Sequence, residues 1–152
     1  MSIIVSNAKE EIKNLIINAA NSAMNDNTLP QVDLTDFSIE VPANRTHGDY
    51  AINAAMVWSK LFRKAPRQIA EEIMMHADLN GTYVEKYEIA GPGFINLFLS
   101  QDYYSDIVTD VITKKENYGK SNYGENKKIL VESSILNNLI NQKKYLLNNL
   151  FI

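Results

Sequence analysis

The sequence predicts a single α+β domain. Helix-like and strand-like segments alternate between residues 7 and 112, and two strand-like runs flank a dense turn signal, as in an antiparallel hairpin. The length of 152 residues suits one domain with one core. Hydrophobic residues make up 45% of the chain and charged residues 22%, which is the balance of an ordinary globular protein.

A long amphipathic helix is expected first. Asn7 followed by Glu10 has the form of a capping box. Apolar residues then recur at helical spacing as far as Met24, namely Ala8, Ile12, Leu15, Ile16, Ala19, Ala20 and Ala23. Asn, Asp and Pro between residues 25 and 33 end this helix.

One strand and two helices are expected next. Residues 37–41 alternate between apolar and polar side chains, which predicts a half-buried strand. After a polar loop over residues 43–48, Asp49 is placed to cap a helix that extends to Leu61. Pro66 opens another helix, which ends near Asn80 and Gly81.

A hairpin and a last helix complete the expected domain. Residues 82–89 and 94–99 have strand-like patterns, and Ala90-Gly91-Pro92-Gly93 lies between them as the turn. Ser100 and Asp102 then cap a helix that extends to Ile112.

The composition changes towards the end of the chain. Residues 114–128 are polar and contain two glycines, as in a linker, and residues 129–131 begin a buried strand. Of the last 20 residues, 13 are Asn, Leu or Ile, so residues 133–152 form a low-complexity tail. The apolar residues of this tail also fit one face of a marginal amphipathic helix.

Composition excludes several kinds of protein. The chain has no cysteine and only two histidines, which rules out disulfides and a Cys/His zinc site, so no metal is expected. It shows neither a signal peptide nor a long apolar span, so we expect no membrane association and a cytoplasmic location.

The charge distribution leaves room only for local RNA binding. The net charge of −3 provides no global field that would attract a polyanion. Four basic residues without an acid between them form one cluster, namely Lys60, Arg63, Lys64 and Arg67. This basic cluster is either a solvated helix end or a set of phosphate contacts.

Five segments in a fixed order together resemble a known family, the N-terminal additional domain of bacterial arginyl-tRNA synthetases. No single segment is specific, but together they extend to about residue 132. They are Glu40-Val41-Pro42 with His47-Gly48-Asp49-Tyr50-Ala51-Ile52-Asn53, Lys64-Ala65-Pro66-Arg67-Gln68-Ile69-Ala70, Ile89-Ala90-Gly91-Pro92-Gly93-Phe94-Ile95-Asn96, Tyr118-Gly119, and Lys128-Ile129-Leu130-Val131-Glu132.

The resemblance implies a fold and a task. The implied fold has two layers, with helices packed on one face of a small antiparallel sheet in an α-β-β-α-β-β-like core. The implied task is to hold the elbow of an arginine-specific tRNA, especially its D-loop, and we expect the chain to do so as a monomer.

The resemblance also implies which residues contact the tRNA. An aromatic residue and an amide engage a D-loop base in this family, and Phe94 and Asn96 occupy these positions. Alternation along a strand places Phe98 on the same face as both, and Ile95, Leu97 and Leu99 on the other. An aromatic ring stacks an unpaired base, and an amide offers it a donor and an acceptor. The alternative is a partly exposed hairpin whose aromatics only cover cross-strand neighbours such as Tyr83 and Tyr87.

The chain departs from the family where a catalytic domain would follow. The His-Ile-Gly-His and Lys-Met-Ser-Lys motifs are absent, so this chain alone is expected to be inactive as an arginine–tRNA ligase. It is expected to bind no cofactor, since ATP and Mg²⁺ belong to the catalytic domain.

The expected organisation has three parts. Residues 1–116 form the N-terminal additional domain, residues 117–132 a linker with the start of the missing catalytic domain, and residues 133–152 the tail. The composition of the tail is that of AT-rich DNA translated in a wrong frame, so a frameshift or a truncated copy is one hypothesis. Two functions stay open, an RNA-binding module or a fragment that only interacts with a partner or has no function.

No motif predicts catalysis. His47 beside Asp49 resembles an acid/base pair, but neighbours at an expected helix start more often serve capping and turn geometry. The adjacent acids Glu10-Glu11 and Glu71-Glu72 lie on expected helices with polar neighbours, as on solvated faces.

Overall fold

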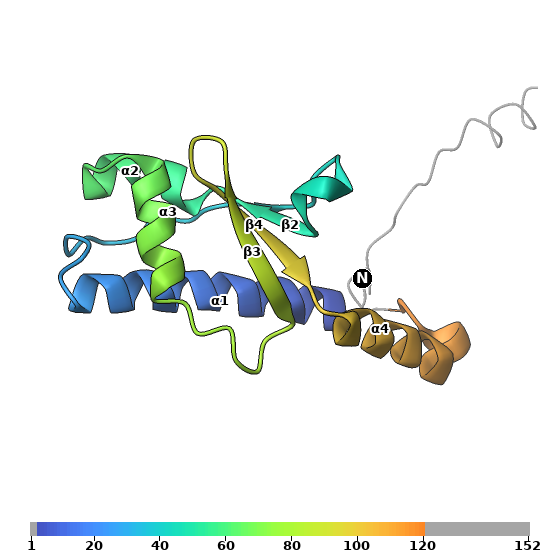
Figure 1. The fold of residues 1–152 in the computed structure, drawn as a ribbon. Coiled ribbons are helices and arrows are strands. Elements are labelled where there is room, and N and C mark those ends of the chain that lie inside the picture. The colour runs from blue at the N-terminus through green and yellow to red at the C-terminus, as the bar shows by residue number, and fades with distance from the viewer. Residues whose placement is uncertain (1–2, 121–152) are drawn as a thin grey trace, which may run out of the picture. The chain divides into compact units, whose positions relative to one another are not determined.

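The structure is a computed structural model that describes residues 3–120 (Figure 1). The elements are α1 (Ile3–Asn25), β1 (Ile39–Glu40), the 3₁₀ turn η1 (Arg45–His47), β2 (Tyr50–Ile52), α2 (Ala54–Phe62), α3 (Pro66–Met75), β3 (Val84–Ala90), β4 (Phe94–Leu99), α4 (Gln101–Lys114) and the 3₁₀ turn η2 (Lys115–Asn117). The α+β class is therefore confirmed. The strand expected at 129–131 and the tail at 133–152 lie outside the described residues.

Helix α1 buries the apolar stripe that predicted it. Ala8, Ile12 and Ile16 are each at most 3% exposed, and they recur at intervals of four residues along one face. The expected capping box is wrong, because the helix begins at Ile3 and Asn7 lies inside it. In Figure 1, α1 runs across the strands, with α2 and α3 near its C-terminal end and α4 near its N-terminal end.

The segment after Asp49 is a strand, where the sequence predicted a helix. Tyr50–Ile52 form β2, and helix α2 begins only at Ala54. Asp49 does not cap this helix. Its carboxylate instead accepts hydrogen bonds from the Leu99 backbone N–H, at 2.8 Å, and from the Tyr104 hydroxyl. Asp49 therefore joins the start of β2 to the end of β4 and to α4.

The four strands form one antiparallel sheet in the order β1-β2-β4-β3. The expected hairpin is confirmed, and β4 has the expected bounds. Strand β4 is central, since it pairs with β2 on one side and with β3 on the other. The register places Asn96 between Ala51 of β2 and Glu88 of β3.

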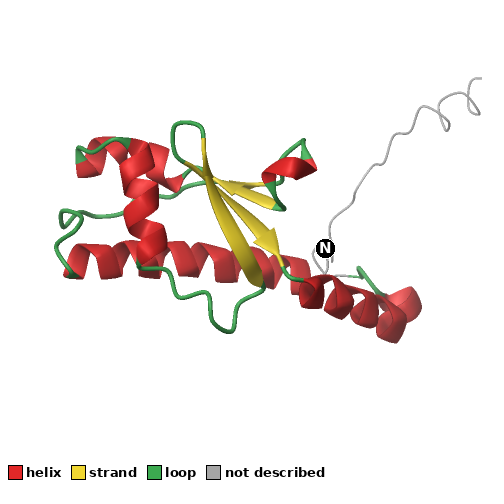
Figure 2. Ribbon diagram, viewed as in Figure 1, coloured by secondary structure: helices red, strands yellow, loops and turns green. Residues whose placement is uncertain are grey.

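The core lies between one face of this sheet and the helices. Figure 2 distinguishes these helices and strands by colour. Trp58 of α2 is fully buried, and its indole N–H donates to the Thr35 carbonyl at 2.8 Å. Because a buried indole N–H needs an acceptor, this bond fixes the loop before β1 against α2. The two-layer arrangement with helices on one face is thus present.

Candidate nucleic-acid interface

The side chains of strand β4 point alternately to the two faces of the sheet. Ile95, Leu97 and Leu99 are 0%, 0% and 6% exposed and face the helices. Phe94, Asn96 and Phe98 lie on the opposite face, which we call the outer face of the sheet. Phe94 is 38% exposed and Phe98 is half-buried, so the aromatic pair is partly open to solvent.

Asn96 is buried although it lies on the outer face. It is 4% exposed, and among the described residues it is the only polar or charged one that is buried. Among the described residues, its side-chain amide makes no hydrogen bond. A buried amide without a partner costs about 1–3 kcal/mol. Since so little of the residue is accessible, a ligand can reach this amide only if a neighbouring side chain moves.

A cation and an acid flank Asn96 on the outer face. The Lys86 ammonium lies over the Phe98 ring, 4.1 Å from its centroid, and it also pairs with the Glu88 carboxylate at 3.0 Å. The hairpin register places Lys86 opposite Phe98 and Glu88 opposite Asn96. The charge of Glu88 is therefore balanced where a polyanion would approach.

Lys86 was not predicted to lie beside the aromatics, and the cross-strand neighbours expected for them, Tyr83 and Tyr87, were wrong. Tyr87 is opposite Leu97, which places it on the other face, and the Tyr83 ring packs against Tyr103. The length of the turn is enough to predict which residue lies opposite Phe98. Ala90 and Phe94 pair across three turn residues, and counting back from that pair places Lys86 opposite Phe98.

The hairpin turn is pressed against the first turn of α3. A Cβ at Gly93 would lie 2.7 Å from the Pro66 carbonyl carbon, and Gly93 has a φ of +139°. Arg67 of α3 donates a long hydrogen bond to the Gly91 carbonyl at 3.5 Å. The turn therefore connects the outer face to one end of the basic cluster.

The four basic residues of the cluster have different surroundings. Lys60 and Arg63 are exposed, and neither has an ion pair with another described residue. Arg67 pairs with Glu71 at 3.3 Å. Arg63 ends α2 with a φ of +52°, in the left-handed region.

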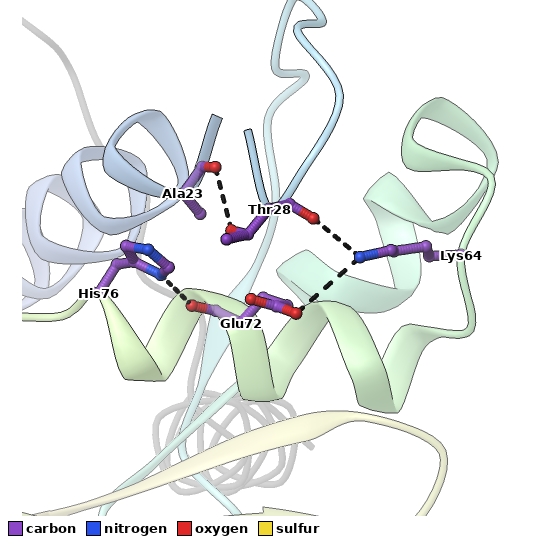
Figure 3. Close-up of polar contacts among 5 residues, drawn as sticks. All are labelled: Ala23, Thr28, Lys64, Glu72 and His76. Atoms are coloured by element: carbon purple, nitrogen blue, oxygen red, sulfur yellow. Dashed lines mark hydrogen bonds and ion pairs between the residues drawn. The ribbon is translucent and has the colours of Figure 1, made fainter. Parts of the chain in front are cut away.

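The Lys64 ammonium makes polar contacts within the protein (Figure 3). Its ammonium donates to the Thr28 carbonyl at 2.8 Å and lies 3.9 Å from the Glu72 carboxylate. The Thr28 hydroxyl in turn donates to the Ala23 carbonyl at 3.0 Å, near the end of α1. Lys64 therefore links the end of α1 to α3.

The His47 region serves turn geometry. The Asn44 side chain accepts from the Thr46 backbone N–H at 3.0 Å, and Gly48 has a φ of +90°. A Cβ at Gly48 would meet the Leu97 carbonyl oxygen at 2.6 Å, so β2 can approach β4 this closely only with glycine there.

The tyrosines beside Asp49 have raised pKa values. Burial, followed by the hydrogen bond to Asp49, raises the pKa of Tyr104 to about 12. Burial also raises the pKa of Tyr103, whose hydroxyl interacts with that of Tyr50.

The described residues show neither a cluster of metal-binding side chains nor a membrane-spanning helix. Residues 3–120 contain no group of three or more His, Asp or Glu side chains placed to hold a metal ion. None of the helices in this range combines the length and the hydrophobicity of a membrane-spanning segment.

The comparison with solved structures concerns the fold. The chain is similar to part of the crystal structure of arginyl-tRNA synthetase from Plasmodium falciparum, with a TM-score of 0.51 and 24% sequence identity over 64% of this chain and 17% of that one. At this identity the comparison shows a common fold.

The sequence comparisons define the family. Residues 8–99 match the model of the arginyl tRNA synthetase N terminal domain, and the chain belongs to this family. It is 42% identical to the arginine–tRNA ligase of Ruminiclostridium cellulolyticum over 132 residues, which are 87% of this chain and 23% of the relative. It is 40% identical to that of Bacillus subtilis over 82% of this chain and 21% of the relative. The chain thus spans less than a quarter of the curated relatives it matches.

Proposed function

We propose that this domain binds arginine-specific tRNA as a monomer, through the outer face of its sheet, and that it works in the cytoplasm with the translation machinery. An unpaired base of the D-loop stacks on Phe94, and the Asn96 amide forms hydrogen bonds with the edge of that base. Lys60, Arg63, Lys64 and Arg67 supply the neighbouring phosphate contacts.

The single observation that carries this proposal is the Asn96 amide. It is a buried polar group without a partner among the described residues, and it lies between two partly open aromatic rings on the same face. An amide presents one acceptor and two donors, which suit the hydrogen-bonding edge of a base. A bound base would therefore satisfy a group that the free domain leaves unsatisfied.

The covered state of Asn96 adds a step to binding. Phe94 begins β4 directly after the turn, and at 38% exposure it is the more open of the two rings. We propose that the Phe94 ring rotates away from Asn96 and then stacks on the incoming base. Stacking on an aromatic side chain tolerates every base, whereas the amide discriminates between bases.

The basic residues contribute unequally in this proposal. Lys60 and Arg63 reach phosphates directly, because both are exposed and have no ion pair within the described chain. Arg67 exchanges Glu71 for a phosphate. Lys64 contributes least, since its ammonium already bonds to the Thr28 carbonyl.

The test is tRNA binding by single variants of the 152-residue chain. Phe94→Ala is expected to weaken binding by about 1–3 kcal/mol for every base at the contacted position. Asn96→Ala is expected to weaken binding by about 1–3 kcal/mol for the preferred base, with little effect for the others. Fluorescence anisotropy with tRNAs that differ at single D-loop positions measures both effects.

Tyr87→Ala is the matched control. Tyr87 is 38% exposed like Phe94 and lies on the same hairpin, but it faces the other way. This control is expected to bind tRNA as the unmodified chain does. Unchanged affinity in folded Phe94→Ala and Asn96→Ala variants would refute the proposal.

A further inference from the structure

Helix α4 carries a row of apolar side chains that the described residues leave open. Tyr104, Val108, Val111 and Ile112 are 39%, 56%, 39% and 66% exposed, and their spacing of four, three and one places them on one side of the helix. Of the 14 residues of α4, only Tyr103 is buried. Figure 2 shows α4 apart from α2 and α3. We call this row the α4 face.

Two hollows adjoin on the α4 face. One, of about 320 Å³, lies against Tyr104, Ser105 and Val108. The other, of about 370 Å³, lies between Tyr104 and the segment that contains Val41, which is itself 70% exposed. Tyr104 lines both hollows, so the two hollows meet at this side chain. Contiguous apolar surface of this kind marks an interaction site.

The acidic residues of α4 lie away from the α4 face. Asp102, Asp106 and Asp110 are two residues before, two after and six after Tyr104, which at about 100° per residue places them on the opposite side of the helix. Among the described residues that line the two hollows, only Arg45 is basic, so the α4 face offers few contacts for the phosphates of an RNA. Its apolar side chains fit a protein partner whose surface is apolar at the centre.

The relatives indicate which protein surface covers the α4 face. Any stretch of 132 residues in a chain of 152 includes α4, so the match to the R. cellulolyticum ligase passes through this helix. The matched stretch is 23% of that relative, and the matching family is an N-terminal domain. In this relative, most of the ligase therefore follows α4 along the same polypeptide.

We infer that the α4 face is the docking surface for the body of an arginine–tRNA ligase, which is the part that follows this domain in the relatives. The body covers Tyr104, Val108, Val111 and Ile112. The inference rests on family membership and the α4 face, and it does not depend on tRNA binding by the outer face.

Thiol labelling tests the inference, because the chain contains no native cysteine. Ile112→Cys places a thiol on the α4 face, and Val108→Cys is a second such variant. Met75→Cys is the matched control, since Met75 is an apolar side chain on α3 with 77% exposure. The same three positions, found by alignment, are changed to cysteine in the intact R. cellulolyticum ligase, and labelling is followed by mass spectrometry without tRNA.

We expect the two α4 thiols to be protected from labelling in the intact ligase but not in the isolated chain. In the 152-residue chain, all three thiols react at comparable rates. In the intact ligase, the two α4 positions react at least about tenfold more slowly than the Met75 position, since a covered thiol reacts only when the contact opens.

Three results would overturn the inference. Equal labelling of all three positions in the ligase means that the body does not cover α4. Protection of Ile112→Cys that rises with the concentration of the isolated chain means that a second copy is the partner. Protection of the isolated chain by added tRNA means that the α4 face binds RNA. A loss of tRNA binding in the Phe94 and Asn96 variants changes none of these results.

Discussion

Asn96 combines a position in the middle of the sheet with a side chain that has no described hydrogen-bond partner. A hydrophobic residue of similar shape would suit the free domain better, because it removes an unsatisfied amide without opening a cavity. The residue at this position therefore trades stability of the free domain for a polar group on the outer face.

Replacement of Asn96 by leucine is expected to stabilise the domain and to weaken tRNA binding. The expected gain in the free energy of unfolding is on the order of 1 kcal/mol, since the cost of the buried amide is removed. That corresponds to a rise in Tm of about 3–4 °C for a domain of this size. Thermal unfolding followed by circular dichroism measures the gain. A fall in Tm would mean that the amide is satisfied in solution, for example by water.

Tyr104 predicts how stability depends on pH in the alkaline range. Its pKa is raised from 10.0 to about 12, so between these values the unfolded chain loses this proton while the folded chain keeps it. The contribution of Tyr104 to the free energy of unfolding is complete below pH 10 and is lost as pH rises towards 12. The free energy of unfolding is therefore expected to fall less steeply in Tyr104→Phe than in the unmodified chain. Urea unfolding at several pH values measures both slopes, and equal slopes would exclude a role for Tyr104.

At the scale of elements, the sequence patterns were informative where an element is long. The stripe of α1 and the two strands of the hairpin were predicted, because each repeats its period several times. Strand β2 was missed, because Tyr50–Ile52 is too short to show alternation. The alanines that follow in α2 extend the helical pattern back across β2. Asp49 then fits a helix cap, whereas its partners are Leu99 and Tyr104, which are distant in sequence.

The outer face of the sheet and the basic cluster were also predictable only in part. Alternation placed Phe94, Asn96 and Phe98 on one face, because this needs only the period of a strand. The burial of Asn96 was not predictable in this way, since it requires knowing that β4 is central and that Ala51 and Glu88 are its neighbours. The hydrogen bond of Lys64 to the Thr28 carbonyl likewise depends on how the loop after α1 packs against the start of α3. The Arg67–Glu71 pair, in contrast, lies within α3 at a spacing of four residues.

The contact between the hairpin turn and α3 predicts different costs for two glycines. Gly93→Ala is expected to destabilise the domain by about 1–3 kcal/mol, because the new Cβ meets the backbone of Pro66 and Arg67. Gly91→Ala is the control. Its φ of +51° is also left-handed, but no atom lies within 4 Å of the added Cβ, so its cost is limited to about 1 kcal/mol of backbone strain. Chemical unfolding of both variants compares them, and equal costs would mean that the turn does not touch α3.

At the scale of the whole molecule, the net charge of −3 means that RNA binding depends on where the basic residues lie. Lys60→Ala and Arg63→Ala are each expected to reduce the slope of log Kd against log salt by about 0.7–0.9, the value for one lost phosphate contact. Lys64→Ala is expected to change this slope less and to lower Tm, because it breaks the link between α1 and α3. Titrations at several salt concentrations measure the slopes. An unchanged slope in both Lys60→Ala and Arg63→Ala would identify the cluster as a solvated helix end.

The strand order β1-β2-β4-β3 also has a consequence for synthesis on the ribosome. β3 and β4 are neighbours along the chain, and a hairpin of this kind closes within about 1–10 μs once both strands have emerged. β2 emerges well before β4, its partner in the sheet, and at about 5–20 residues per second it waits on the order of seconds. During that delay β2 can pair with β1, but the edge that later pairs with β4 has no strand partner. The nascent chain is thus most exposed to aggregation, and most in need of a chaperone, just before the hairpin leaves the ribosome.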